Sequence, residues 1–277
     1  MSKKNSIISI ENVSFTYPPP NRIQALKNVS LSIENGEFVA LIGQNGSGKT
    51  TLAKCISGFL KPTKGAVKIN GRNTKDMRTS DLAKEVGYIF QNPDHQLFKE
   101  SIYDEIAFGL RNIETPKQEI ERKVREVLER MHLWEFRDLH PFRLGKGQRQ
   151  RVAISAILAM EPKILVIDEP TTGQDRKEAR AIMDLTRDLN KEGITALVIT
   201  HAMNLVAEYT KRTVALCEGQ MLVDDTTREV FGQIDLLSHT YVEPPQITML
   251  GNALGINPPV LTVDETKDAV MKRIRNN

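Results

Sequence analysis

The stretch Gly43-Gln44-Asn45-Gly46-Ser47-Gly48-Lys49-Thr50 decides the fold of this chain. It fits the pattern G-x-x-x-x-G-K-[ST], whose glycines let the backbone come close to a triphosphate so that successive N–H groups face its negative charge. The apolar run Phe38–Ile42 before it has the composition of a buried strand, and Thr51–Ile56 after it that of a helix start. Because strand, loop and helix follow in this order, we interpret the stretch as a phosphate-binding loop rather than a plain glycine-rich turn.

This loop and the start of its helix predict the cofactors. Lys49 is expected to reach the β- and γ-phosphates of a bound nucleoside triphosphate, and the Thr50 hydroxyl to ligate Mg²⁺. The N–H groups at the helix N-terminus face the same phosphates. A nucleoside triphosphate, which the family resemblance described below implies is ATP, and Mg²⁺ are therefore the predicted cofactors. The loop residues expected to bind them are Gly43, Gln44, Asn45, Gly46, Ser47, Gly48, Lys49, Thr50 and Thr51.

The composition is that of an ordinary globular protein. The chain has 277 residues, of which 40% are apolar and 26% charged, and its net charge of +3 is too small to indicate nucleic acid or an anionic membrane surface as a partner. No apolar run reaches the roughly 20 residues of a bilayer span, and the first residues lack the apolar core of a signal peptide. Cys55 and Cys217 both lie in apolar segments, which fits a reducing compartment. We therefore expect a cytosolic protein.

Patterns along the chain divide it into one large α/β domain and a short extension. Ile7–Val13 and Ala25–Ile33 alternate apolar and polar residues, which predicts an antiparallel β layer. Residues from about 95 to 160 have mostly helical patterns and form a predicted helical subdomain. Beyond about residue 220 prolines break the chain. We expect a nucleotide-binding domain over residues 1–220 and a C-terminal extension over residues 221–277, which packs on the main domain or on another subunit.

A second apolar run ends in two carboxylates. Lys163–Glu169 has the composition of a buried strand and closes with Asp168 and Glu169. An unpaired charge at the edge of a core costs free energy. Two adjacent carboxylates at the end of a buried strand therefore indicate a functional site. We expect Asp168 to hold Mg²⁺ through water, and Glu169 to polarise a water molecule for attack on the γ-phosphate.

Polar residues also follow two other predicted strands. Gln91 ends the run Val86–Phe90, where an amide is well placed to hold a metal ion or a water molecule. His201 follows the buried run Thr195–Thr200. Taken alone, His201 is more simply a structural histidine, but at a strand end of the same sheet it is placed to contact the γ-phosphate.

Two further segments have weaker signals. Tyr17, next to a proline-rich turn, is either a plain core residue or an aromatic face on which adenine stacks. Leu144-Gly145-Lys146-Gly147-Gln148 opens a predicted helix, so it is either a second anion site or a loop with a positive rim.

Taken in order, these segments resemble the ATP-binding cassette (ABC) ATPases over nearly the whole of residues 7–220. The matching positions are Tyr17 for the A-loop, Gly43–Thr50 for Walker A, Gln91 for the Q-loop, Leu144–Gln148 for the signature, Asp168 and Glu169 for Walker B and the catalytic acid, Gly173-Gln174-Asp175 for the D-loop and His201 for the switch histidine. The resemblance implies an α/β P-loop NTPase fold of ABC ATPase type, with an antiparallel β layer, a helical subdomain and a small C-terminal extension. It also implies an ATP hydrolase in which Gln91, Glu169 and His201 serve catalysis, and Thr50, Gln91 and Asp168 surround Mg²⁺.

Within that class, Gln91–Phe98 and the proline-broken tail are similar to the energy-coupling factor (ECF) ATPases, including the cobalt-transport type. This resemblance implies a peripheral ATPase on the cytoplasmic face of a prokaryotic cell membrane, driving uptake of a vitamin or a transition metal ion. A pair of ATPases would sit on a transmembrane coupling subunit, which works with a substrate-binding membrane subunit. Gln91–Phe98 would be the docking surface, and the tail would help to hold the pair together.

The signature departs from the family pattern Leu-Ser-Gly-Gly-Gln, because Gly145 replaces serine and Lys146 replaces the first glycine. In ABC dimers the signature, here Gly145, Gly147 and Gln148, closes on the γ-phosphate bound by the partner. Loss of a serine hydroxyl bond to phosphate costs roughly 1.5–3 kcal/mol. Lys146 offers a compensating charge, but adds roughly 1 kcal/mol of strain if its position needs a positive φ. A less effective signature would suit a heterodimer, and the sequence leaves homodimer and heterodimer open.

Three other functions compete with the ECF interpretation. One is the ATPase of a conventional importer fed by a soluble binding protein, which only Gln91–Phe98 and the tail disfavour. Another is a soluble ABC protein acting on ribosomes or DNA, against which stand the single cassette and the absence of a basic arm. The third is a regulatory module without hydrolysis, which the presence of Glu169 and His201 argues against. The transported substrate does not follow from the sequence, because such an ATPase never touches it.

Overall fold

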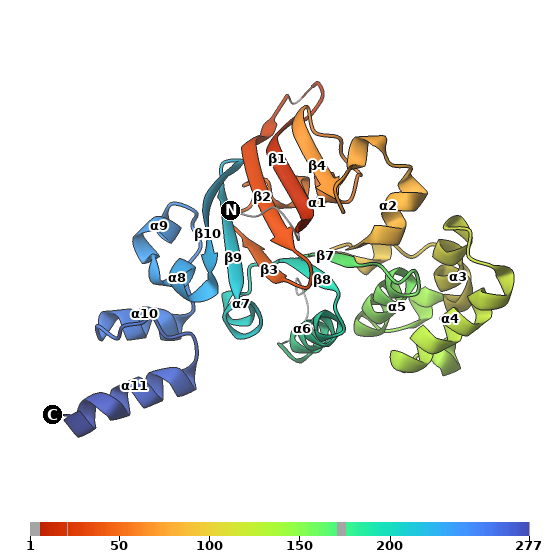
Figure 1. Ribbon diagram of the computed structural model, residues 1–277. Coiled ribbons are helices and arrows are strands. Elements are labelled where there is room, and N and C mark those ends of the chain that lie inside the picture. Colours follow the sequence, from red (N-terminus) through yellow and green to blue (C-terminus); the bar gives the residue numbers. More distant parts are fainter. Residues whose placement is uncertain (1–5, 21, 171–175, 277) are drawn as a thin grey trace.

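The computed structural model describes residues 6–20, 22–170 and 176–276, which fold around two β-sheets (Figure 1). The strands of the larger sheet are β3 (Phe38–Ile42), β6 (Val86–Ile89), β7 (Ile164–Asp168), β8 (Thr195–Ile199), β9 (Arg212–Cys217) and β10 (Gln220–Thr226). They lie in the order β10-β9-β3-β8-β7-β6, and all neighbours are parallel except β9 and β10. The sheet is therefore of the open α/β type that the sequence predicts.

The central strands of this sheet are buried along their whole length. β3, β7 and β8 expose none of their residues, as expected of parallel strands covered on both faces. In the register of the sheet, Leu41 and Asp168 both pair with Ile199. The carboxyl ends of the three strands thus lie at one edge, which is where open α/β sheets bind their ligands.

The smaller sheet is the predicted antiparallel layer. Its strands are β1 (Ser6–Thr16), β2 (Gln24–Glu34), β4 (Lys64–Ile69) and β5 (Arg72–Asn73), in the order β2-β1-β4-β5. Helix α1 (Lys49–Ile56) follows the phosphate-binding loop, and its buried side chains join apolar residues of both sheets in one core. This packing fixes the start of α1 relative to the β3 edge.

A second core forms the helical region. Apolar faces of α3 (Ile102–Asn112), α4 (Lys117–Arg130) and α5 (Lys146–Leu158) pack together and against the sheet. In α4 the apolar residues that face this core are buried, with Ile120 and Val124 at 8% and 0% exposure. The remaining helices of the main body are α2 (Thr79–Glu85), α6 (Arg176–Lys191) and α7 (Met203–Tyr209). The predicted fold class is confirmed.

The C-terminal extension begins on the sheet and ends away from it. Strand β10 lies beyond the expected boundary at residue 220, yet it pairs with β9 in the large sheet. Phe231 and Leu237 are fully buried against Ala40 and Val206 of the main body. The helices after β10 are α8 (Thr227–Gly232), α9 (Ile234–Ser238), α10 (Gln246–Ala253) and α11 (Val263–Asn276), and α10 and α11 project from the body (Figure 1). Among the described residues, none of the helices has the length and apolar character needed to cross a membrane.

Candidate active site

The phosphate-binding loop has a backbone that tolerates only glycine at two points. Gly43 has φ 143° and Gly48 has φ 104°. A Cβ at Gly43 would lie 2.2 Å from the carbonyl oxygen of Leu216, and one at Gly48 would lie 2.5 Å from that of Ala25. Both glycines are therefore required by close approach of neighbouring strands as well as by their φ angles.

The Lys49 ammonium lies inside the curve of this loop. Its Nζ donates to the carbonyl oxygens of Gly43, at 2.8 Å, and Gln44, at 2.9 Å. Burial lowers the pKa of Lys49, while the carboxylates of Glu169 and Asp168 oppose that shift. The ammonium is thus held in place by the loop with acidic groups nearby.

Asp168 is held from two sides at the end of β7. Thr50 Oγ1 donates to its Oδ1 at 3.2 Å, and the Tyr88 hydroxyl donates to its Oδ2 at 2.6 Å. Asp168 itself is 5% exposed. The structure therefore brings together Thr50 and Asp168, two of the three residues predicted to surround Mg²⁺.

Glu169 lies next to this group, between Gln91 and His201. Gln91 Nε2 donates to Glu169 Oε2 at 3.1 Å, and His201 Nε2 lies 3.1 Å from Glu169 Oε1. Glu169 adopts φ 49°, and its backbone N–H donates to the Ile199 carbonyl of β8 at 2.9 Å. A left-handed backbone at a carboxylate-bearing residue is uncommon and is typical of functional positions. Of the three predicted catalytic residues, Glu169 thus contacts both of the others, and the amide of Gln91 points to Glu169.

Tyr17 lies beside the start of α1. Its hydroxyl is 3.1 Å from Thr51 Oγ1, and its half-buried ring meets the ring of Phe15 edge to face at 4.9 Å. Of the two interpretations of Tyr17, this placement favours a residue that borders the nucleotide site, because Thr51 follows the predicted Mg²⁺ ligand directly.

The signature residues lie elsewhere, at the N-terminus of α5. Gly145 is its N-cap, and the Gly145 N–H donates to Gln148 Oε1 at 3.2 Å. A Cβ at Gly147 would come within 2.4 Å of a Glu178 carboxylate oxygen on α6. Lys146 is the first residue of helix α5, so its backbone does not need a positive φ. The backbone strain that a positive φ would have caused at Lys146 is therefore not present. Gly173-Gln174-Asp175 lies outside the described residues.

Two contributors to this region were not found from the sequence. One is Tyr88, which looked like one apolar residue of a short strand. The other is the ion pair between Arg149 and Asp94, with Arg149 Nε 2.7 Å from Asp94 Oδ1 and Arg149 Nη1 donating to the Leu144 carbonyl at 2.8 Å. It joins the Gln91–Phe98 segment to the signature helix. Both contacts depend on elements that are distant in sequence, so no local pattern indicates them.

The residues at this edge of the sheet fit a nucleotide and a divalent cation. Ser47 Oγ is buried without a hydrogen-bond partner, although hydroxyls at that depth are normally bonded. A phosphate oxygen at the loop would satisfy it. The neighbouring hydroxyl and carboxylate, Thr50 and Asp168, are the oxygen ligands that Mg²⁺ prefers. The arrangement is therefore able to hold a metal-bound triphosphate and a water molecule beside Glu169.

Comparisons with known proteins agree with this geometry. A model of the ABC transporter family matches residues 26–172. An energy-coupling factor transporter ATP-binding protein, EcfA2 of Acetivibrio thermocellus, is 41% identical, with 97% of this chain and 99% of the relative covered. An ABC transporter ATP-binding protein of Methanosarcina mazei is 44% identical over 88% of this chain, which spans 42% of that relative. The chain spans about two fifths of the first curated relatives that it matches.

Solved structures show the same similarity. CbiO1 from Clostridium perfringens, described as part of the ABC transporter complex cbiONQ, has a TM-score of 0.75 and 32% identity, covering 91% of this chain and 100% of that one. A dimeric ATP-binding cassette in a post-hydrolysis state, bound to ADP and Pi, has a TM-score of 0.70 and 33% identity, covering 80% of this chain and 99% of that one. The chain therefore belongs to the ABC transporter family, as one of its ATP-binding ATPases.

Proposed function

We propose that this chain is the ATPase of an ECF-type importer, in which closure of two ATPase chains on ATP drives uptake of a vitamin or a transition metal ion. The observation that supports hydrolysis best is the placement of Glu169. Its carboxylate lies 3.1 Å from both Gln91 and His201, directly after Asp168 at the carboxyl end of β7. A base held in this way is suited to activating water rather than to a passive binding module.

In the proposed reaction, the residues have separate tasks. Lys49 and the loop N–H groups hold the phosphates, while Thr50 and Asp168 hold Mg²⁺ with Gln91 completing the set. Mg²⁺ supplies charge neutralisation of the β- and γ-phosphates when bound. Glu169 orients the attacking water and accepts its proton, and His201 steadies the γ-phosphate. The rate acceleration comes from positioning and electrostatic stabilisation, as expected for phosphoryl transfer.

The proposed docking surface for the transmembrane coupling subunit is the Gln91–Phe98 segment. Phe98 is 60% exposed and stacks edge to face on Phe108 at 5.0 Å. A groove of about 510 Å³ runs beside it, and its lining includes Phe98, Phe108, Ile113, Ala156, Ile157 and Met160. Large exposed apolar groups beside a groove are typical of protein contacts. The Arg149–Asp94 pair then connects this surface to the signature helix.

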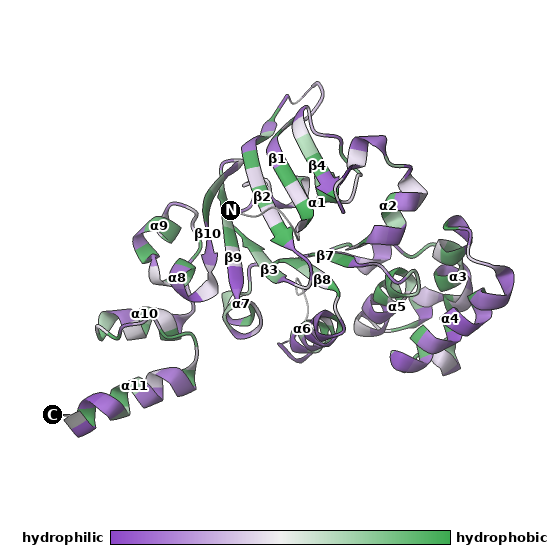
Figure 2. Ribbon diagram, in the orientation of Figure 1, coloured by the Kyte–Doolittle hydropathy of each residue, from purple (hydrophilic) through white to green (hydrophobic). Residues whose placement is uncertain are grey.

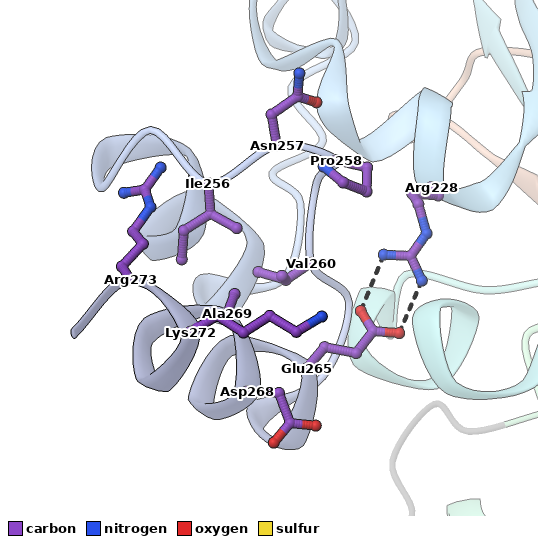
Figure 3. A pocket seen from close by; sticks show the side chains of 10 residues that line it. All are labelled: Arg228, Ile256, Asn257, Pro258, Val260, Glu265, Asp268, Ala269, Lys272 and Arg273. Atoms are coloured by element: carbon purple, nitrogen blue, oxygen red, sulfur yellow. Dashed lines mark hydrogen bonds and ion pairs between the residues drawn. The ribbon is translucent and has the colours of Figure 1, made fainter. Parts of the chain in front are cut away.

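The tail is the proposed contact that helps to hold the ATPase pair together. Arg228 of α8 binds Glu265 of α11 through both guanidinium Nη atoms, at 3.0 and 2.7 Å (Figure 3). Figure 2 shows apolar residues interspersed along α10 and α11. Several apolar residues on these helices or directly after α10 are exposed. These are Met249, Leu250, Leu254, Val263, Met271 and Ile274. Such a face on helices that project from the body is suited to covering by a second chain.

Support for the ECF type over a conventional importer comes from full-length similarity to proteins named EcfA2 and from the cbiO1 structure. Purification of the tagged chain from detergent-solubilised native membranes tests the proposal. We expect a polytopic coupling protein, a small substrate-binding membrane subunit and, for a heterodimer, a second ATPase. Recovery of ribosomal proteins, or of a soluble binding-protein system instead, would contradict it. Because Gly145 lacks the hydroxyl of the signature serine, this signature is expected to be less effective, which suits a heterodimer with a second ATPase.

A further inference from the structure

Asp168 receives a hydrogen bond from a residue outside the recognised motifs. The Tyr88 hydroxyl lies 2.6 Å from Asp168 Oδ2, whereas Thr50 approaches the other oxygen, Oδ1, at 3.2 Å. An ionised carboxylate only accepts, so the phenol is the donor, and the distance is that of a charge-assisted bond. The two oxygens of Asp168 are thereby distinguished from each other.

The ring of Tyr88 is itself fixed by its neighbours. It is 4% exposed, and its ring meets Phe59 at 5.3 Å and Phe90 at 4.9 Å, both edge to face. Strand β6, which carries it, pairs with β7, which carries Asp168. The donor therefore has a defined place beside Asp168.

We propose that Tyr88 is a positioning residue of the metal site, which holds Oδ2 of Asp168 so that Oδ1 faces Thr50 and Mg²⁺. This inference rests on the proposed Mg²⁺ site. Rotation about the terminal bond of an aspartate is soft, so a carboxylate without a fixed partner samples many orientations. In Tyr88→Phe the ring would keep its packing and only the donor would be lost, leaving a buried Asp168 oxygen without its bond.

Mn²⁺ binding to the full-length chain tests the inference. The chain is loaded with a non-hydrolysable ATP analogue, Mn²⁺ is titrated in, and the bound ion is followed by electron paramagnetic resonance. We expect Tyr88→Phe to raise the half-saturating Mn²⁺ concentration about tenfold, the effect of losing one charge-assisted hydrogen bond. Affinity for the analogue in EDTA is expected to stay within about twofold of wild type, because Lys49 and the loop are untouched.

Two further variants separate positioning from general damage. Tyr209→Phe removes the same kind of bond elsewhere, since the Tyr209 hydroxyl donates to Asp184 Oδ1 at 2.9 Å, and it is expected to leave Mn²⁺ binding unchanged. Phe59→Ala keeps the Tyr88 hydroxyl but removes a half-exposed ring that packs on it. It is expected to shift Mn²⁺ binding in the same direction by a smaller factor, and it serves as the test if Tyr88→Phe does not fold.

The outcomes are distinguishable. If wild type binds Mn²⁺ only with nucleotide and Tyr88→Phe behaves like wild type, the positioning role is wrong and the metal site stands. If Tyr209→Phe weakens Mn²⁺ binding as much as Tyr88→Phe, the effect is not specific and the inference also fails. If wild type shows no nucleotide-dependent Mn²⁺ binding, the proposed metal site itself is refuted.

Discussion

The proposed docking segment, Gln91–Phe98, depends on one buried carboxylate, and removal of this carboxylate has a calculable effect on stability. Glu105 of α3 is 3% exposed, and its Oε2 accepts the backbone N–H groups of Phe98, at 2.8 Å, and Lys99, at 2.7 Å. These two bonds fix the backbone beside the exposed Phe98 ring. Glu105→Ala removes this acceptor and leaves two N–H groups without partners.

The expected magnitudes follow from the type of bond. A hydrogen bond to a charged group contributes about 1.5–3 kcal/mol, so Glu105→Ala is expected to lower the free energy of unfolding by about 3 kcal/mol or more. Glu105→Gln keeps one carbonyl oxygen at the same place but loses the charge, and about 1–1.5 kcal/mol of destabilisation is expected. The predicted order of stability is wild type, Glu105→Gln, Glu105→Ala.

Urea unfolding followed by circular dichroism measures this order, with the slope of the transition compared among variants. Glu100→Ala, at an exposed position two residues after this segment, is the matched control and is expected to stay within about 0.5 kcal/mol of wild type. If Glu105→Ala also stays within that range, the carboxylate does not hold the segment. Weakened binding of the coupling subunit should accompany the loss of stability if the segment is the docking surface.

Two other substitutions test the loop and the signature. Gly48→Ala would place a methyl group 2.5 Å from the Ala25 carbonyl oxygen at φ 104°, so we expect the free energy of unfolding, measured by thermal unfolding, to fall by at least about 2 kcal/mol. Gly46 has φ 80° but nothing within 4 Å, so Gly46→Ala should cost only about 1 kcal/mol. Equal effects of the two substitutions would refute the close-approach argument. The double substitution Gly145→Ser, Lys146→Gly restores the serine hydroxyl and is expected to raise the ATPase rate of the assembled complex up to about tenfold, whereas an unchanged rate would remove the signature departure from the mechanism.

The central strands were predictable because their signal is local. Phe38–Ile42 is a continuous apolar run between a polar turn and a glycine, and the structure gives β3 the same bounds. The ends of parallel strands then had to share an edge, so Asp168, Glu169 and His201 were expected together before their distances were known. The same reasoning about strand ends placed Gln91 at this edge as a ligand of a metal ion or a water molecule, whereas its hydrogen bond to Glu169 was not predicted.

Other features depend on pairings that no local pattern contains. The domain boundary expected after residue 220 falls within β10, which begins at Gln220 and belongs to the sheet only because it pairs with β9. Tyr88 reaches Asp168 because β6 and β7 are adjacent in the sheet. The residue pattern of neither strand indicates which strands are adjacent. The Arg149–Asp94 pair likewise joins segments 55 residues apart. The family pattern has glycine at the position of Lys146, so it did not indicate that α5 begins at this residue.

Hydrolysis by Glu169 is tested most directly by Glu169→Gln, which keeps the side-chain volume and removes the base. The measurement is single-turnover ATP cleavage by the assembled transporter, together with nucleotide affinity of the same preparation. The account predicts ATP affinity within about twofold of wild type and cleavage slower by about 100-fold or more, the usual contribution of a general base. Cleavage at a rate near wild type, with ATP bound normally, would contradict the role given to Glu169 and with it the proposed mechanism.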